Sequence, residues 1–406
     1  MTNFVRELQS AAMMNTTATA VECDEPVTFS QLWSATDSFA GGLQDSELTA
    51  GDRVTVHLSD PRSFLIAVYG TLRAGCVPVT LPEASENRDV KRAVAETEPK
   101  AHVTDSGRIM ALLNSSESLR LAVIVDNEVR LGVSLSTFLE NDGMNGSNSR
   151  TGIDVVRRAD DSPGLIAYLE RDAPDPLAVV YTHASLRAAA NAGTTLGSIE
   201  SDGDLESHRS ALSLSNSIEL MYGANAILTD GGSYHPIPDP DPETIRSLLV
   251  ATDIDRTFVT PSQYRALRAS DPSVDEGDLR VVTPLSTALD TQVRDGGDAV
   301  RLCVLPEIGI SHVRSPVDVE AGRLGRSLPG VRACVLEEGG SDELAVSGPA
   351  LMDGYFDRPA LTDETVTTID GDRWIETGLS VQSQDGPIDL GERAETGRAL
   401  PSDERP

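Results

Sequence analysis

Lysine is almost missing from this chain of 406 residues: it occurs only as Lys91 and Lys100, so arginine supplies nearly all of the 33 basic side chains. With 64 acidic residues, the formal net charge is −31. Such a surface repels the phosphates of nucleic acids and of anionic membranes, so neither is an expected partner. Because salt screens this self-repulsion, we expect adaptation to a salt-rich cytoplasm; a merely acidic protein is the alternative.

Cysteines and long apolar runs are also scarce. The four cysteines form no CxxC pair, which gives no support to a zinc site or a disulfide framework and favours isolated buried thiols in a reducing compartment. The longest apolar run, residues 64–72, is too short to span a bilayer. Residues 1–7 do not resemble a signal peptide. We therefore expect a cytoplasmic protein without a membrane anchor.

Glycine and lysine are absent where an α/β nucleotide-binding protein would need them. Residues 164–167 read as a strand that enters a loop at 168–178, and a return strand follows before a helix begins near Ser185. A phosphate-binding loop uses glycines, so that backbone N–H groups can close on the anion, and usually a lysine. Here the loop carries Glu170, Asp172 and Asp175 instead, which would repel a phosphate.

A regular α/β pattern is nevertheless present. A buried strand at 53–58, a helix at 61–74 and a second strand at 76–81 alternate with turn residues, which is typical of a parallel sheet. The length is sufficient for two or three packed subdomains. Polar stretches at 141–148 and 198–208 are expected to be surface loops, and a helix is expected from Glu219 to Leu228.

These segments resemble the AMP-forming acyl-CoA synthetases of the adenylate-forming ligase superfamily. Residues 50–54 and 72–79 are close to the start of such enzymes, and Tyr168, Pro176 and the Thr182-His183 pair match the frame of their hallmark loop. The glycines, hydroxyls and lysine of that loop do not match. The framing is family-like, and the chemistry of the loop is missing.

The resemblance implies two flavodoxin-like parallel-sheet subdomains, a small β-rich barrel-like subdomain and a polar tail, with boundaries at 1–162, 163–322, 323–395 and 396–406. The small C-terminal lid domain of the family, with its catalytic lysine, is expected to be absent.

Site residues follow only from the resemblance. Glu307 is the relic of a magnesium-binding glutamate, and Leu379 replaces an aspartate that binds ribose. Tyr168, Thr377 and Arg393 are candidates for nucleotide contacts, and Asn216 and Pro284 for the substrate pocket. Each could equally be a satisfied structural residue.

Two further segments have a structural interpretation. His183 is expected to be mainly structural, although its position matches the family. Residues 192–197 echo a hydroxyl-rich phosphate loop, but they lie in or after a helix, so we interpret them as coincidence.

Two functions remain open. The first is a synthetase-like protein that no longer adenylates and binds an acyl or aryl ligand, or a partner such as an active ligase. The second is a working AMP-dependent ligase with unusual site residues or with a separate completing subunit. ATP with magnesium, and CoA, are cofactors that only the resemblance implies.

Overall fold

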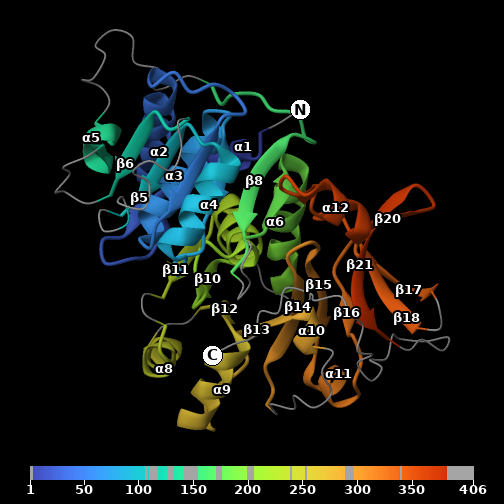
Figure 1. Cartoon of the computed structure of the whole chain (residues 1–406). Helices are drawn as coiled ribbons and strands as arrows, with labels where there is room; N and C mark the ends of the chain where they lie inside the picture. Colours follow the sequence, from blue (N-terminus) through green and yellow to red (C-terminus); the bar gives the residue numbers. More distant parts are fainter. Residues whose placement is uncertain are drawn as a thin grey trace.

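The computed structural model describes residues 3–105, 108, 118–125, 132–140, 154–170, 176–198, 205–237, 240–251, 254–288, 297–338 and 341–381. The predicted loop at 141–148, the predicted tail at 396–406 and Arg393 lie outside these ranges. Figure 1 shows an α/β body with two large sheets and a smaller sheet, coloured red, at one side.

The first sheet has eight strands and is parallel from β8 to β7. Across the sheet the strands run β19 (Gly354–Tyr355), β9 (Ala178–Thr182), β8 (Pro163–Tyr168), β4 (Val77–Thr80), β3 (Arg53–His57), β5 (Ala101–Thr104), β6 (Leu121–Ile124) and β7 (Val133–Ser134). The hairpin β8–β9 is antiparallel and ends the parallel part, and β19 pairs with its outer strand.

The second sheet has nine strands and is parallel from β14 to β1. They run β16 (Arg326–Ser327), β15 (Gly309–Arg314), β14 (Val300–Leu305), β13 (Leu279–Pro284), β12 (Arg256–Val259), β10 (Ser207–Ser210), β11 (Ser233–Pro236), β1 (Thr19–Val21) and β2 (Val27–Thr28). The third sheet is antiparallel: β17 (Arg332–Glu338), β18 (Ser341–Ser347), β21 (Asp372–Ser380) and β20 (Val366–Ile369). The predicted fold class is confirmed in these parallel-sheet subdomains and the small antiparallel sheet.

The helices connect and cover these sheets. They are α1 (Val5–Met14), α2 (Phe29–Asp45), α3 (Pro61–Arg73), α4 (Asn87–Thr97), α5 (Leu135–Leu139), α6 (His183–Ser198), the π-helix η4 (Glu219–Ala224), α7 (Asn225–Asp230), α8 (Pro242–Ala251), α9 (Pro261–Ser270), α10 (Leu285–Ala288), α11 (Pro316–Glu320) and α12 (Pro359–Thr365).

Local sequence signals set several helix starts. Thr28 and Gln31 form a reciprocal capping box at the start of α2. The carboxylate of Asp60 accepts the Ser63 N–H at 2.8 Å, directly before a proline at the first position of α3. The predicted strand–helix–strand unit at 53–81 is confirmed, since β3, α3 and β4 follow one another there.

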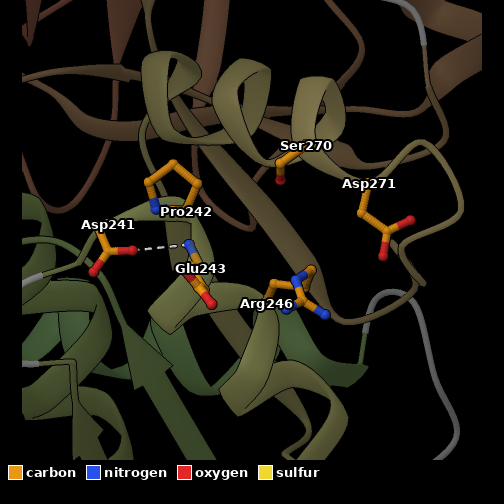
Figure 2. Close-up of a pocket in the computed structure, with 6 residues that line it drawn as sticks. All are labelled: Asp241, Pro242, Glu243, Arg246, Ser270 and Asp271. Atoms are coloured by element: carbon orange, nitrogen blue, oxygen red, sulfur yellow. Dashed lines mark hydrogen bonds between the residues drawn. The ribbon is translucent and has the colours of Figure 1, made fainter.

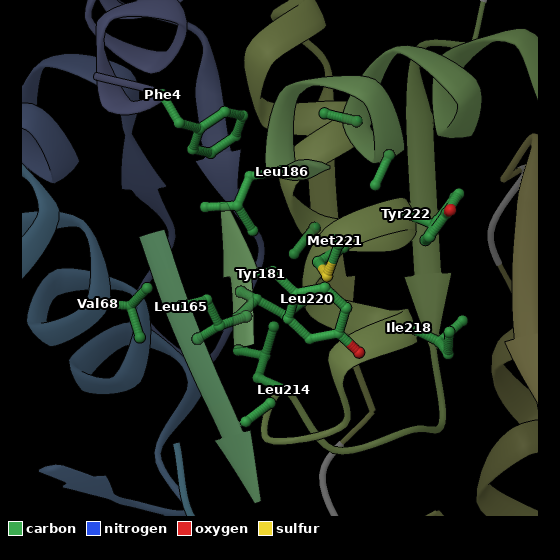
Figure 3. Packing of buried hydrophobic residues seen from close by; sticks show 14 of the residues in the cluster. Phe4, Val68, Leu165, Tyr181, Leu186, Leu214, Ile218, Leu220, Met221 and Tyr222 are labelled. Carbon is green, nitrogen blue, oxygen red and sulfur yellow. The ribbon is translucent and has the colours of Figure 1, made fainter. Parts of the chain in front are cut away.

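An apolar core joins the first and second sheets. Figure 3 shows Leu165 of β8 and Tyr181 of β9 facing Leu220 and Met221 of η4, with Phe4 above them. Phe4 is fully buried, and its backbone N–H donates to His183 Nδ1 at 3.3 Å. His183 therefore anchors the N-terminal segment, as the structural interpretation predicts, and burial lowers its pKa to about 4.

Sheet membership does not follow the predicted boundaries. The hairpin β8–β9 belongs to the first sheet, although residue 163 is the predicted start of the second subdomain. Strands β1 and β2 lie near the N-terminus but extend the second sheet through β11. The chain therefore crosses between the sheets more often than consecutive domain ranges suggest.

The predicted loop at 198–208 is wrong at its end. Residues 199–204 lie outside the described residues, but Ser207 and His208 belong to β10, and the fully buried His208 ring is hydrogen-bonded to Arg256 and Glu219. The predicted helix from Glu219 to Leu228 is confirmed, with a π-helix for its first six residues and an α-helix from Asn225. Two thiols, Cys76 and Cys303, are buried as expected, whereas Cys23 and Cys334 are half-buried.

Candidate functional site

The turn between β14 and β15 carries Glu307 and is approached by three buried tyrosines. Tyr181 donates from its hydroxyl to the Pro306 carbonyl at 2.7 Å and lies 3.2 Å from Ser217 Oγ. Tyr355 donates to Glu307 Oε1. Tyr222, from η4, receives a hydrogen bond from the Ile310 backbone. The turn is thus fixed by β9, β19 and η4 together.

Glu307 is an engaged carboxylate rather than an exposed one. Its side chain is 2% exposed, and its main-chain carbonyl accepts the Met352 N–H at 3.0 Å. Burial, and then the Glu307 charge, raises the pKa of Tyr355, so its phenol stays protonated and keeps donating. A metal ion at this carboxylate would have to compete with that hydrogen bond.

The glycine-free loop lies in the hairpin between β8 and β9. Of its acidic residues, Glu170 is exposed, while Asp172 and Asp175 fall outside the described residues. Tyr168 is buried and donates to Glu96 Oε2 at 2.8 Å, and the same carboxylate pairs with Arg358 at 2.6 Å. Tyr168 therefore links the first sheet to the start of α12 and offers no hydroxyl to a nucleotide.

Thr377 and Leu379 are both turned into the protein. Thr377 is fully buried and donates its hydroxyl to the Leu344 carbonyl at 2.7 Å. Leu379 is 7% exposed and belongs to the apolar core. Where the resemblance places ribose contacts, this structure has a satisfied hydroxyl and a packed alkyl group.

The two candidates for the substrate pocket come from separate segments, the turn before η4 and the end of β13. Asn216 is exposed, and its Oδ1 accepts the Ile218 N–H at 2.9 Å, which caps the turn before η4. Pro284 ends β13 and is half-buried. The sequence did not single out the three tyrosines, although Tyr181 and Tyr355 stand beside matched motifs.

A hollow of about 490 Å³ lies elsewhere, between the start of α8 and the end of α9. Figure 2 shows the residues that line it, which are Asp241, Pro242, Glu243, Arg246, Ser270 and Asp271. Asp241 is occupied in capping α8, since it accepts the Glu243 and Thr244 N–H groups. None of the predicted site residues lines this hollow.

In the described part of the chain, no cluster of three or more His, Cys, Asp or Glu side chains is arranged to hold a metal ion. Within the same ranges, no helix is long and apolar enough to cross a membrane.

Comparisons with known proteins agree with this architecture. A family model described as "AMP-binding enzyme" matches residues 8–168. The chain is similar to a 4-hydroxybenzoate–CoA/benzoate–CoA ligase from Rhodopseudomonas palustris, with 26% identity over 353 residues, 80% of this chain and 62% of that ligase. The chain thus spans less than two thirds of that relative.

The resemblance to the adenylate-forming ligase superfamily is confirmed. Two solved structures share the fold of this ligase-like chain. The benzoate CoA ligase from Burkholderia xenovorans superposes with a TM-score of 0.78 at 18% identity, covering 97% of this chain and 80% of the other. The N-terminal domain of FACL13 from Mycobacterium tuberculosis gives 0.79 at 18% identity, with 97% and 100% covered.

The ligase-like site does not fit a magnesium–nucleotide group with the side chains described. Glu307 is hydrogen-bonded to Tyr355, Thr377 to a backbone carbonyl, and Leu379 is apolar. Magnesium prefers oxygen ligands held in near-octahedral geometry, and a ribose needs polar partners.

Proposed function

We propose that this adenylate-forming ligase-like protein no longer adenylates an acid and serves as a ligand- or partner-binding protein. The observation that supports this most directly is the engagement of Glu307 by Tyr355 in a buried contact. A cation beside a triphosphate would have to compete with Tyr355 for this buried carboxylate.

Charge supports the same proposal. Adenylation needs positive charge or hydrogen-bond donors on the transferring phosphate, and one such donor is worth about 2.7–4 kcal/mol. The hallmark loop here has Glu170, Asp172 and Asp175 and no lysine. The loss of several donors together would remove most of the rate enhancement.

The test is exchange of pyrophosphate into ATP with magnesium in about 2 M KCl, with benzoate, 4-hydroxybenzoate and fatty acids as substrates. We expect no exchange above a sample without acid. Acid-dependent exchange that disappears in Glu307→Gln would overturn the proposal and favour an active ligase. An active ligase of known activity in the same buffer is the positive control.

The second candidate, an active AMP-dependent ligase completed by another chain, has one observation in its favour. The similarity to the Rhodopseudomonas palustris ligase covers 80% of this chain, so the framework is shared well beyond the hallmark loop. Adding fractions of the native cytoplasm to the exchange assay would separate the two. Exchange restored by a fraction supports completion by a partner.

We also propose that the protein works in a salt-rich cytoplasm and binds a protein partner, either an active ligase or another subunit. A pull-down from the native cytoplasm at high salt should then recover this partner in stoichiometric amount. Asn216 is exposed, and a bulky Asn216→Arg change would test the surface before η4.

A further inference from the structure

A buried polar network lies behind the π-helix η4, inside the core of the second sheet. Arg256, His208 and Glu219 are each at most 1% exposed. Arg256 Nε donates to His208 Nδ1 at 3.1 Å, so His208 Nε2 carries the ring proton and faces Glu219 Oε1 at 3.3 Å. Ser210 Oγ donates to the other carboxylate oxygen at 2.6 Å.

The charges in this network are balanced. Burial, and then the Arg256 charge, lowers the pKa of His208, so the ring is neutral and links a cationic guanidinium to an anionic carboxylate. Buried charges are tolerated when they are paired and hydrogen-bonded. Removing one partner would leave an uncompensated charge in the core, so the three side chains act as one unit.

Arg256 also binds the helices directly. Its Nη1 donates to the Gly193 carbonyl of α6 at 2.6 Å, and its Nη2 donates to the Tyr222 carbonyl of η4 at 3.1 Å. The wide turn of a π-helix departs from the regular i→i+4 pattern and often marks functional segments. The Arg256 guanidinium thus holds η4 through one of its backbone carbonyls, that of Tyr222.

Two glycines make room for this arrangement. A Cβ at Gly223 would lie 2.5 Å from Glu219 Oε1 and 2.6 Å from His208 Nε2. A Cβ at Gly193 would lie 2.6 Å from the Ala226 Cβ and would also overlap the Tyr222 carbonyl. Gly193 belongs to the segment 192–197, and its missing side chain lets α6 pack closely on η4 and α7.

The held π-helix positions Tyr222 at the Glu307 turn. The Tyr222 phenol lies against Gly309, where φ is +82° and a Cβ would overlap the ring, and it receives a hydrogen bond from the Ile310 backbone. The path therefore runs from Arg256, His208 and Glu219 through η4 to Tyr222 and the turn.

We infer that Arg256, His208 and Glu219 are positioning residues that hold η4, and through Tyr222 the turn at 306–310. The inference concerns the same turn as the proposed function. Its test reads backbone exchange rather than ligand binding, so the two can fail separately.

The experiment is hydrogen exchange of the peptide covering residues 306–310 in about 2 M KCl. In Glu219→Gln we expect exchange there to quicken by about tenfold or more, because the network loses its charge balance. The control is Glu276→Gln: this carboxylate, like Glu219, accepts a side-chain hydroxyl, from Tyr264 at 2.7 Å, but it lies next to β13. Glu276→Gln should leave exchange at 306–310 unchanged, even where it lowers the melting temperature as much as Glu219→Gln does.

A double-mutant cycle separates positioning from general destabilisation. In the Tyr222→Phe background, Glu219→Gln should add little further exchange at 306–310, because the path through the phenol is already cut. Additive effects, or unchanged exchange in the single variant, would overturn the inference. If Glu219→Gln does not fold, Gly223→Ala, which crowds Glu219 and His208, replaces it in the same cycle.

Discussion

Acidification should unfold this protein through its histidines. Five of them are at most 3% exposed: besides His208 of the buried network, they are His57, His102, His183 and His312. Burial is the largest cause of their lowered pKa values, which fall from 6.5 to about 4 for His57, His183 and His312 and to about 3 for His102. Arg108 adds to the effect at His57, and His57 adds to it at His102.

The sign and size follow from proton linkage. Between the folded and unfolded pKa values the unfolded chain binds more protons, so stability is full above about pH 7.5 and falls as the pH decreases. At about pH 5.5 an unfolded histidine is mostly protonated and a folded one is not, which costs about 1.4 kcal/mol per group. Four groups give about 5–6 kcal/mol as an upper limit, comparable with the whole stability of many domains.

The assay is urea unfolding followed by circular dichroism, from about pH 7.5 to about pH 5.5 in about 2 M KCl, which screens the carboxylates. His57→Gln should reduce the pH slope by up to about 1.4 kcal/mol per pH unit. Thr104→Val is the matched control, because Thr104 pairs with His57 in the sheet and does not titrate. A free energy of unfolding that stays constant down to pH 5.5 would refute the reasoning.

Three further changes test other contacts. The melting temperature should rise strongly from low to molar KCl, since the formal charge is −31, and a flat response would contradict salt adaptation. Tyr355→Phe should cost about 1.5–3 kcal/mol in urea unfolding by leaving the buried Glu307 short of a donor, and more than Tyr168→Phe, whose partner Glu96 keeps Arg358. Gly309→Ala should lower the free energy of unfolding by about 2 kcal/mol or more, because φ is positive there and the Cβ would overlap Tyr222. Gly322→Ala, where φ is also positive but the space is open, should cost about 1 kcal/mol. Equal losses would argue against the contact with Tyr222.

The sequence was sufficient for the elements whose signals are local. The capping box at Thr28 and the proline after Asp60 fix helix starts, and the alternation of strands and helices predicts parallel sheets. The pairing of β8 and β9 with the first sheet, and of β1 with β11, could not be read from the sequence. Sheet membership is decided by tertiary packing, which leaves no mark at a single segment.

The site divides in the same way. The resemblance located the turn at Glu307, and the structure added what the carboxylate contacts. The contacts of the three tyrosines with this turn could not be predicted, because each tyrosine stands far from Glu307 in sequence. Tyr222 is also placed by a π-helix, which apolar periodicity cannot distinguish from an α-helix. The sequence predicts a loop at His208, because a polar residue among acidic ones is typical of an exposed segment, whereas in the core Arg256 and Glu219 hydrogen-bond to its ring.

Titration calorimetry with ATP and magnesium in about 2 M KCl tests the proposed loss of adenylation most directly. The glycine-free acidic loop and the engagement of Glu307 by Tyr355 predict no saturable heat at millimolar nucleotide. The same sample should still unfold cooperatively, which shows that the protein is intact. A saturable heat that requires magnesium and weakens in Glu307→Gln would contradict the proposal.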